Sequence, residues 1–335
     1  MELSVKAESW PVREGFAISR GPVHEVQVVV ATVRDGGFEG RGESEPYKRY
    51  DETVESVQTQ IASIHNAFEE GMSRKELQDA LPAGAARNAL DCALWDLEAK
   101  QKGETIWELL GIEPVPKSIS FTIGLDTPET MAKRAADAAK KYSILKIKLG
   151  AEGDEERLRA IREAAPEARL IVDANEGWNE NNIEAMLRAC EAARIELIEQ
   201  PVSENYSSIL PARRSLGAGG QNTRTSIMLC ADESAHTAAN IEKLVGTYQA
   251  VNIKLDKTGG LTEALAMVKK AKVAGLKIMV GCHVSTSLSM APATVVAQMA
   301  DYVDLDGPLL LERDREPSIE YKNGMIFPTT PTLWG

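Results

Sequence analysis

Two lysines placed two residues apart, Lys146 and Lys148, have a spacing that could do chemistry. They alternate with Leu145, Ile147 and Leu149, and in a β-strand this alternation directs the apolar side chains to one face and both ammonium groups to the other. A solvated lysine face on an edge strand would give the same pattern. This strand lies within a long alternation of strands and helices, however, where strands are covered on both faces. Burying two like charges is costly unless an anion or a reaction requires them, so we expect both lysines in a site.

Carboxylates stand at the ends of three successive strand candidates further along the chain, at Asp173, Glu199 and Asp232. A single Asp in such a place is usually a helix cap, but three in consecutive units would meet at the same end of a parallel sheet. Their repulsion would raise the pKa of each carboxyl unless a cation lay among them. Ligands that are all oxygen suit Mg²⁺ better than zinc. We therefore predict one Mg²⁺ ion bound by these three side chains.

A third lysine, Lys254, belongs to the strand candidate 250–255, in which Asn252 and Lys254 share the inner face. In an eight-stranded ring this sixth strand lies opposite the second, which carries the lysine pair. Ammonium groups would then approach one point from two sides. The alternative interpretation is a structural salt bridge from Lys254 to Glu199 or Asp232.

The last strand candidate ends in the segment 304–308, which places Asp304 and Asp306 on one face. Two neighbouring carboxylates could hold the ammonium group of a substrate. They could also cap the turn that follows, and the local sequence leaves both interpretations open.

The elements that must position these residues form a regular alternation after residue 116. Strand candidates lie at 118–123, 144–149, 169–173, 195–199, 228–232, 250–255, 276–281 and 302–305. Helix candidates between them include 127–141, 154–164, 179–193, 261–274 and 287–300. Eight strands with intervening helices, and no regular helix after the last strand, predict a closed parallel barrel with its chemistry at the carboxyl ends of the strands.

The first 115 residues have a different pattern, which predicts an α+β unit. Two antiparallel strands are expected within 3–33, followed by a hairpin turn at 34–37. Helices are expected at 51–68 and 83–101. The loop 15–22 carries Phe16, Ile18 and Arg20 between glycines and a proline, and it could be either an active-site lid or an ordinary surface connection. Residues 113–116 are a plausible domain boundary.

Composition excludes several classes of function. The net charge of −12 argues against a nucleic-acid-binding surface, and no apolar run is long enough to span a bilayer. Charged residues near the N-terminus argue against a signal peptide. The four cysteines are far apart in the sequence and form no C-x-x-C pair, which is typical of reduced thiols in a cytoplasmic protein.

In these combined motifs the chain resembles the muconate-lactonizing-enzyme subgroup of the enolase superfamily, and within it the dipeptide epimerases of the L-Ala-D/L-Glu type. The resemblance covers nearly the whole chain. The matching segments are 81–97, 146–148, 173–175, 199–201, 231–234, 252–260 and 304–308.

The resemblance implies a modified TIM barrel, (β/α)₇β, at 116–307, an N-terminal α+β capping domain at 1–115, and a C-terminal tail, 308–335, that packs back on the cap. It implies that Lys148 and Lys254 are the two acid/base groups and that Lys146 assists the substrate carboxylate and depresses the pKa of Lys148. It assigns Mg²⁺, one per subunit, to the three carboxylates, and it implies a homo-oligomer. The substrate would be bound by Arg20, Thr122, Cys282, His283, Ser285, Asp304 and Asp306, the last two holding the α-ammonium of a dipeptide and Arg20 an acidic side chain.

Two departures from the family pattern bear on the substrate. The segment 203–228 is longer than usual, and its irregular part, 215–225, is expected to be a surface insertion. His283 stands where an apolar residue such as Met is expected, so it either alters the side-chain preference or only packs beside the pocket. The expected reaction is Mg²⁺-dependent dipeptide epimerisation. The alternatives are an N-succinylamino-acid racemase or a cycloisomerase of the same subgroup, and a metal-binding barrel without catalytic activity.

Overall fold

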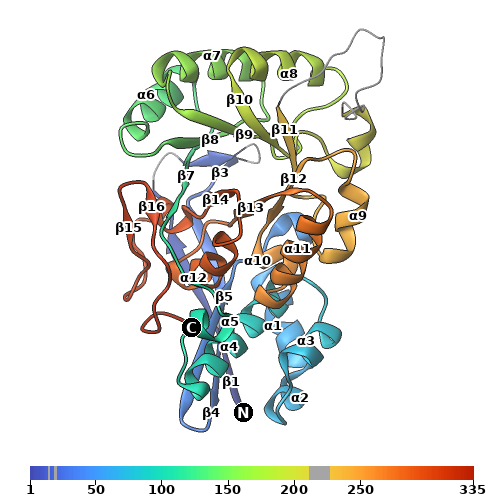
Figure 1. Ribbon diagram of the computed structural model, residues 1–335, viewed down its shortest axis with the longest axis vertical. Helices are drawn as coiled ribbons and strands as arrows, with labels where there is room; N and C mark the ends of the chain where they lie inside the picture. Colours follow the sequence, from blue (N-terminus) through green and yellow to red (C-terminus); the bar gives the residue numbers. More distant parts are fainter. Residues whose placement is uncertain (14–15, 19–20, 211–226) are drawn as a thin grey trace.

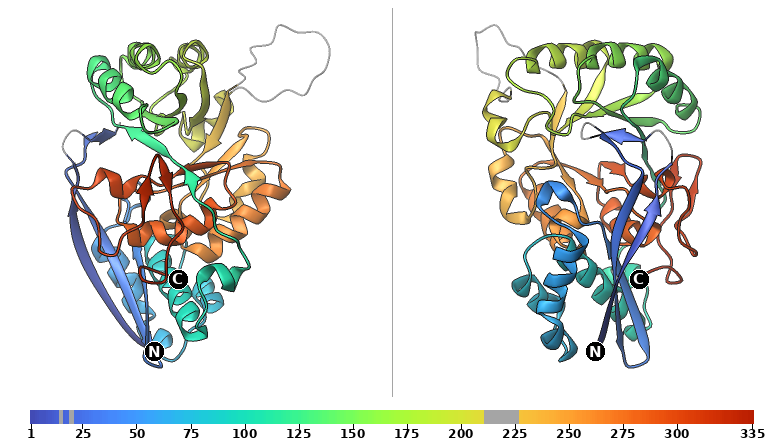
Figure 2. Two further views of the ribbon diagram at one scale, coloured as in Figure 1. Left: turned by 60° about the vertical axis from the view of Figure 1, so that its left-hand side comes forward. Right: turned by 180° about the vertical axis from the view of Figure 1, so that it is seen from behind.

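The computed structural model describes residues 1–13, 16–18, 21–210 and 227–335 (Figure 1). It contains a parallel barrel and, beside it, an antiparallel sheet packed against helices. Figure 2 shows the long blue strands of that sheet running along one side of the molecule up to the barrel. In the described part of the chain, no helix combines the length and the apolar character needed to cross a membrane.

The barrel is one sheet of eight strands, all parallel, whose order follows the sequence. Every strand candidate of the repeating part is confirmed to within about two residues at each end. The strands are β7 (Ser120–Ile123), β8 (Ile144–Lys148), β9 (Arg169–Asp173), β10 (Ile195–Glu199), β11 (Met228–Ala231), β12 (Ala250–Ile253), β13 (Lys277–Gly281) and β14 (Tyr302–Asp304).

Side chains bridge the first and last strands, β7 and β14, which form the two edges of the sheet. The Ser120 hydroxyl donates to Asp304 Oδ1 at 2.6 Å and to the Val303 carbonyl at 3.4 Å. The Thr122 main-chain N–H donates to Asp306 Oδ2 at 2.7 Å. These bonds bring the two edges together, so the ring is nearly closed and strands β8 and β12 stand opposite each other.

The interior of the barrel is layered by the two-residue period of its strands. Ile144, Ile171, Leu197, Cys230, Ala250, Met279 and Tyr302 form a buried apolar cluster at one level. Two residues further along the strands, the inward positions are polar, and they include Lys146, Asp173, Glu199, Asp232, Asn252 and Asp304. The intervening residues, such as Leu145 and Ile147, belong to the large core under the helices. An apolar floor therefore supports a charged layer at the carboxyl ends.

Helices follow most of the strands, as expected for (β/α)₇β. They are α6 (Pro128–Ala138), α7 (Asp154–Ala164), α8 (Ile183–Ala192), α9 (Ile241–Leu244), α10 (Leu255–Thr258), α11 (Leu261–Val273) and α12 (Ser287–Ala297). After β14 there is only the 3₁₀ turn η4 (Gly307–Leu310) in place of an eighth helix. Between β10 and β11 the described residues form the 3₁₀ turn η2 (Glu204–Ile209), and the expected insertion at 215–225 lies outside the described residues.

The N-terminal sheet has the order β1 (Glu2–Pro11), β4 (Glu25–Asp35), β5 (Phe38–Ser44). The expected strand pair and hairpin turn are confirmed, and the turn leads into a third strand, β5. Two short strands, β2 (Ala17–Ile18) and β3 (Gly21–Pro22), pair beside the barrel. Helix α4 (Ala85–Lys102) lies across β4 and β5, and it approaches closely because Gly40 and Gly42 have no side chain. A Cβ on either glycine would lie 2.2 Å or less from a carbonyl of α4.

Four shorter helices complete this unit: α1 (Val54–Ser63), α2 (His65–Glu69), α3 (Arg74–Ala80) and α5 (Ile106–Leu110). The prediction of a single helix at 51–68 is wrong, because the chain leaves helical geometry at Ile64 and forms two helices, α1 and α2. The break lets Phe68 of α2 bury its ring completely in the same apolar cluster as Val57 and Ile61 of α1. Burial of one large aromatic side chain outweighs the few hydrogen bonds lost at the break.

The C-terminal tail returns to the first unit. Strand β16 (Met325–Ile326) pairs with β15 (Tyr321–Lys322) and β6 (Lys117–Ser118). Further on, the fully buried Trp334 donates its indole N–H to the Cys92 carbonyl of α4 at 3.0 Å. The Gly335 N–H donates to Asp96 Oδ1 at 2.7 Å, so the chain ends in the core of the N-terminal unit.

Candidate active site

A cavity opens at the carboxyl ends of the barrel strands. Of the residues predicted from the sequence, nine line it: Thr122, Lys146, Lys148, Asp232, Lys254, Cys282, His283, Asp304 and Asp306. Asp173 and Glu199 lie immediately beneath, completely buried and in contact with the lysines. The barrel therefore brings together residues that are separated by up to about 180 positions in the sequence.

Lys146, at the centre of β8, joins three carboxylates. Its Nζ lies 2.6 Å from Glu199 Oε2, 2.7 Å from Asp304 Oδ2 and 3.2 Å from Asp173 Oδ2. Burial by itself would lower the pKa of Lys146, but the surrounding carboxylates outweigh burial and raise that pKa well above its usual value. Lys146 is therefore a positive charge held in place by three carboxylates.

Lys148, two residues further along β8, reaches the cavity. Its Nζ donates to Asp173 Oδ2 at 2.7 Å and to Asn175 Oδ1 at 3.1 Å. Asn175 follows β9 with a positive φ of 44°, a left-handed conformation that directs its amide back toward the lysine. The amide and the carboxylate together hold the ammonium group at the cavity wall.

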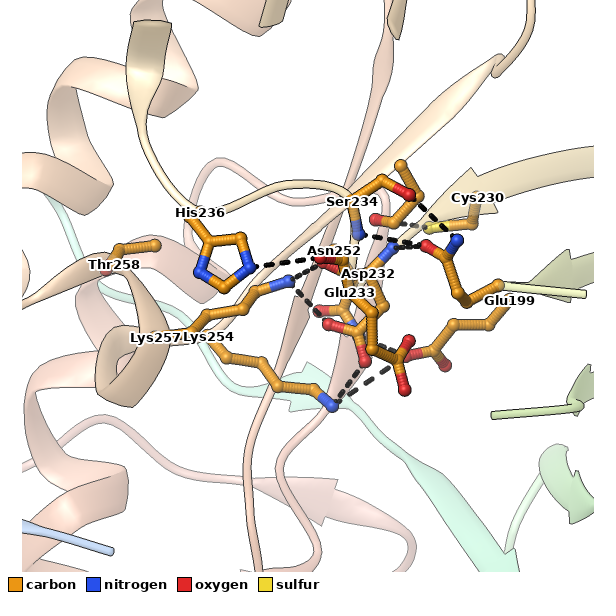
Figure 3. Close-up of polar contacts among 12 residues, drawn as sticks. Glu199, Cys230, Asp232, Glu233, Ser234, His236, Asn252, Lys254, Lys257 and Thr258 are labelled. Carbon is orange, nitrogen blue, oxygen red and sulfur yellow. Dashed lines mark hydrogen bonds and ion pairs between the residues drawn. The ribbon is translucent and has the colours of Figure 1, made fainter. Parts of the chain in front are cut away.

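Lys254 approaches from the opposite side of the barrel, from the junction between β12 and the one-turn helix α10. Figure 3 shows its ammonium group directed at Asp232, with Nζ 2.6 Å from Oδ2 and 3.9 Å from Glu199 Oε1. Burial would lower the pKa of Lys254, but Asp232 and Glu199 outweigh it and raise the pKa well above the usual value. The salt bridge to Asp232 given as the alternative is thus present, in a residue that also lines the cavity.

Lys257, which was not among the predicted site residues, is a second partner of Asp232. Its side chain is completely buried, and its Nζ lies 2.5 Å from both Asp232 Oδ1 and the Asp232 carbonyl oxygen. Lys257 follows Lys254 by three residues, a spacing that places two side chains on the same face of a helical turn. The signal was present in the sequence, but it depends on a helix only four residues long that the local pattern does not indicate.

The three carboxylates have the composition of a site for a hard divalent cation. Burial, then the charge of Asp173, raises the pKa of Glu199 to about 8, while nearby lysines outweigh burial and hold the pKa values of Asp173 and Asp232 below their usual range. Within the described ranges, no three His, Cys, Asp or Glu side chains already form a metal cage. Lysine ammonium groups occupy the space between the carboxylates instead. A bound divalent cation would favour the ionised form of Glu199 and offset the repulsion between the carboxylates. Three carboxylate ligands therefore fit Mg²⁺.

Asp304 and Asp306 differ in their partners. Asp304 is bound by Ser120 and Lys146, whereas Asp306 accepts the Thr122 N–H. Burial and the neighbouring Asp304 raise the pKa of Asp306 to about 7. Both carboxylates line the cavity, so they are placed to face a bound group as well as the turn.

The structure places the remaining substrate-binding predictions as follows. His283 lines the cavity, stacks on Tyr47 with ring centroids 4.3 Å apart, and has Nδ1 3.0 Å from Glu45 Oε2. Cys282 also lines the cavity. Ser285 does not line the cavity in the described part of the chain. Its hydroxyl donates to the His283 carbonyl at 3.2 Å instead. Arg20 lies outside the described residues.

A segment of the N-terminal unit covers the cavity, and no pattern in the sequence predicted it. Tyr47, Tyr50 and Glu45 lie between β5 and α1 and line the cavity beside Phe16 and Ile18. The adjacent Arg49 holds this segment to the barrel, because its guanidinium donates two hydrogen bonds to Glu176, at 2.7 and 2.9 Å. Two aromatic contacts add to this attachment: Tyr47 stacks on His283, and Tyr50 meets His236 edge-on.

Both parts of the chain match family models. Residues 1–111 match the N-terminal domain of the mandelate racemase / muconate lactonizing enzyme family, and residues 130–333 match the enolase C-terminal domain-like model. The chain belongs to the mandelate racemase / muconate lactonizing enzyme family. Within this family, two of its similar relatives are an L-Ala-D/L-Glu epimerase of Escherichia coli and an N-acetyl-D-glutamate racemase of a Pseudoalteromonas species. The first is 42% identical over 97% of this chain and 98% of the relative, and the second 43% identical over 92% and 95%.

Solved structures of the family superimpose closely on this member. An enolase family member from Agrobacterium tumefaciens with homology to dipeptide epimerases, solved with sodium and L-Ala-L-Glu, has a TM-score of 0.94, 47% identity and 99% coverage of both chains. A dipeptide epimerase from Enterococcus faecalis, complexed with Mg and L-Leu-L-Tyr, has a TM-score of 0.87 and 27% identity, and the alignment covers 98% of this chain and 96% of that one.

Proposed function

We propose that this protein is a Mg²⁺-dependent dipeptide epimerase that inverts the α-carbon of the C-terminal residue of an L-Ala-Glu-type dipeptide. The observation that carries the proposal is the position of Lys148 and Lys254, which enter one cavity from the opposed strands β8 and β12. The printed names and contents of the similar proteins support the same reaction.

Inversion of an α-carbon needs a base on one face of the substrate and an acid on the other. Lys148 and Lys254 supply one group for each face: one lysine removes the α-proton, and the opposite lysine returns a proton. Their existing partners, Asn175 and Asp173 for Lys148 and Asp232 for Lys254, hold the two ammonium groups in fixed directions. Held in this way, the reacting groups lose little freedom when substrate binds.

The α-proton of a carboxylate is very weakly acidic, so the site must stabilise the negative charge that develops on the carboxylate oxygens. Lys146 is a buried, fixed positive charge in the correct layer of the barrel. Asp173, Glu199 and Asp232 would hold Mg²⁺, which would add positive charge at the substrate carboxylate and neutralise the carboxylates that now raise the pKa of Lys254.

Asp304 and Asp306 support a substrate with a free amine. The two carboxylates face the cavity, where a substrate ammonium group could bind beside Asp306, whose pKa is raised by burial and by Asp304. An N-acylated amino acid has no such charge. The 43% identity to an N-acetyl-D-glutamate racemase nevertheless makes an N-acyl substrate the specific competitor.

The test compares the two substrate classes directly. The protein, with Mg²⁺ in D₂O, is incubated with L-Ala-L-Glu and separately with N-acetyl-L-Glu, and the α-proton signal and the second epimer are followed by NMR. We expect rapid exchange and inversion of the dipeptide, and loss of both after chelation with EDTA and recovery on adding Mg²⁺. Turnover of only the N-acyl compound would replace the dipeptide proposal, and no turnover of either would reject both racemase functions.

We also infer the organisation of the molecule from these contacts and from family likeness. Residues 1–115 would act as the capping domain, 116–307 as the barrel, and 308–335 as a tail that fastens the two together. We expect a homo-oligomer that acts in the cytoplasm, in keeping with four cysteines that form no disulfide.

A further inference from the structure

Helix α4 of the N-terminal unit contacts the active site indirectly. Residues in its first turn form hydrogen bonds with helix α10, which begins directly after Lys254. Helix α10 begins directly after β12, has Lys254 as its N-cap residue, and lies against α4 (Figure 1). It is only one turn long, and an isolated helix of this length has no stability of its own. Its geometry must therefore be imposed by its neighbours.

Arg87 of α4 makes two hydrogen bonds to the end of α10. Its guanidinium is buried, and the hydrogen bonds it donates go to main-chain carbonyls: Thr258 at 2.8 Å and Gly259 at 3.2 Å, at the C-terminus of α10, and Gln78 and Leu81 of the cap at 3.2 and 3.3 Å. Burial lowers the pKa of Arg87 in spite of nearby carboxylates. Carbonyl oxygens at the C-terminus of a helix favour a hydrogen-bonding cation, so Arg87 fastens the end of α10 to the capping domain.

Asn88, the next residue of α4, holds the same helix from its middle. Its side-chain amide donates to Asp256 Oδ1 at 3.1 Å, and the same oxygen accepts the main-chain N–H of Glu45 at 2.9 Å. Asp256 lies between the two lysines of α10 in sequence, and its side chain points to the cap while those of Lys254 and Lys257 point to Asp232. The cap thus holds α10 on the side opposite the reacting amine.

The packing here leaves little room for α10 to shift. A Cβ on Gly259 would lie 2.4 Å from Arg87 Nε, and a Cβ on Gly260 would lie 2.5 Å from the Asp91 side chain. Both glycines have φ values, 82° and 110°, that favour glycine. The turn that ends α10 is therefore fitted directly against α4.

We propose that Arg87 and Asn88 are positioning residues for Lys254: through α10, the capping domain sets the direction of the amine that acts on one face of the substrate. The proposal rests on the proposed epimerase function. Lys148 has no comparable dependence among the described contacts, because its partners Asp173 and Asn175 belong to the barrel itself. Loosening α10 should therefore impair one of the two bases and spare the other.

The experiment uses full-length Asn88→Ala and Arg87→Lys, because lysine keeps the charge but cannot form the same fork of donors. Each epimer of Ala-Glu is incubated in D₂O with Mg²⁺, and deuterium incorporation with retention is measured separately from inversion. A displaced Lys254 slows inversion, whereas Lys148 still exchanges the proton of the epimer that faces it. A misplacement of the order of 1 Å can cost about a hundredfold in rate, so we expect inversion to fall by about tenfold or more.

The diagnostic result is an asymmetry. For the epimer whose proton faces Lys148, exchange with retention should change less than about twofold while inversion falls, and KM should change little. For the other epimer, exchange with retention and inversion should fall together.

Trp95→Phe is the matched control, because Trp95 lies on the same helix but donates to Thr262 of α11 at 3.0 Å rather than to α10. It should affect both epimers equally and weakly.

The outcomes separate the possibilities. An equal loss of exchange with retention for both epimers in the variants, or no loss of inversion, would overturn the positioning role, since a purely structural contact lowers all rates in proportion to the folded fraction. If Arg87→Lys fails to fold, Asn88→Ala decides the question. A wild-type protein that neither exchanges nor inverts Ala-Glu would reject the epimerase function, and with it the inference, whereas normal wild-type turnover with symmetric losses rejects the inference alone.

Discussion

Lys254, the N-cap residue of α10, and Lys257, three residues later, each place an ammonium group on a different oxygen of Asp232, at 2.6 and 2.5 Å. The two lysines are nevertheless not equivalent. Lys257 is completely buried, whereas Lys254 reaches the cavity. One lysine is thus a permanent structural partner of the carboxylate and the other is available to a substrate, which is why only Lys254 is a candidate acid/base group.

Replacing either candidate base should separate proton exchange from inversion. We expect Lys148→Ala and Lys254→Ala each to lower epimerisation by about 10³-fold, because each face of the α-carbon has a single amine and general acid/base groups contribute about 10²–10⁴-fold. Each variant should still exchange the α-proton of one epimer, and a different one in each case. NMR in D₂O with both epimers measures this. Wild-type rates of inversion in either variant would contradict a mechanism with two bases.

Removing one carboxylate charge at the end of β14 should discriminate between substrates. Asp306→Asn keeps the acceptor for the Thr122 N–H but loses the charge that faces a substrate ammonium. Hydrogen bonds to charged groups contribute about 1.5–3 kcal/mol, so we expect KM for L-Ala-L-Glu to rise about 10- to 100-fold. Steady-state kinetics with N-acetyl-L-Glu serves as the comparison, and an equal rise in KM for that compound would rule out the ammonium subsite.

The stability of the protein should depend on pH through Asp256. Burial raises the pKa of this residue to about 7 in the folded protein, whereas an unfolded Asp titrates near about 3.9. Between these values the folded state holds a proton that the unfolded state has released, so this residue makes the folded state less stable as pH rises. Asp256→Asn removes the effect and keeps an acceptor for the Glu45 N–H. Its free energy of unfolding relative to wild type should therefore be higher at pH 8 than at pH 5.

Urea denaturation of both proteins at these two pH values measures that difference. One pKa unit corresponds to about 1.4 kcal/mol, so the difference between the two pH values should reach a few kcal/mol. The same difference at pH 5 and pH 8 would mean that Asp256 ionises normally in the folded protein.

The C-terminal tail should contribute strongly to stability. Trp334 is fully buried and bonded to α4, so Trp334→Ala leaves a large cavity and removes the indole hydrogen bond to the Cys92 carbonyl. Truncations of buried aromatic residues to Ala cost about 3–5 kcal/mol, and we expect a loss of that size in the free energy of unfolding. Thr332→Ala, at an exposed position in the same tail, should change it by less than about 0.5 kcal/mol. Similar values for the two variants would show that the tail does not anchor α4.

The sequence by itself determined the barrel and the identity of its inner layer. The alternation in 144–149 and 250–255 decides which side chains face inward, because a strand has a period of two residues. Parallel strands then bring all carboxyl ends to one edge, so Asp173, Glu199 and Asp232 could be grouped before their positions were known. Both inferences need only local pattern and topology, and both agree with the structure.

Only the tertiary structure decided how the two parts of the molecule meet. Tyr47 reaches His283, and Arg87 reaches the end of α10, across about 170 or more positions in the sequence. Neither contact leaves a periodic signal in the chain. Ser285 turned out to face its own backbone rather than the cavity, and the helix at 51–68 breaks at Ile64 to bury Phe68. Such choices depend on which distant surface fills a given space, and packing between elements sets them rather than the preferences of the residues alone.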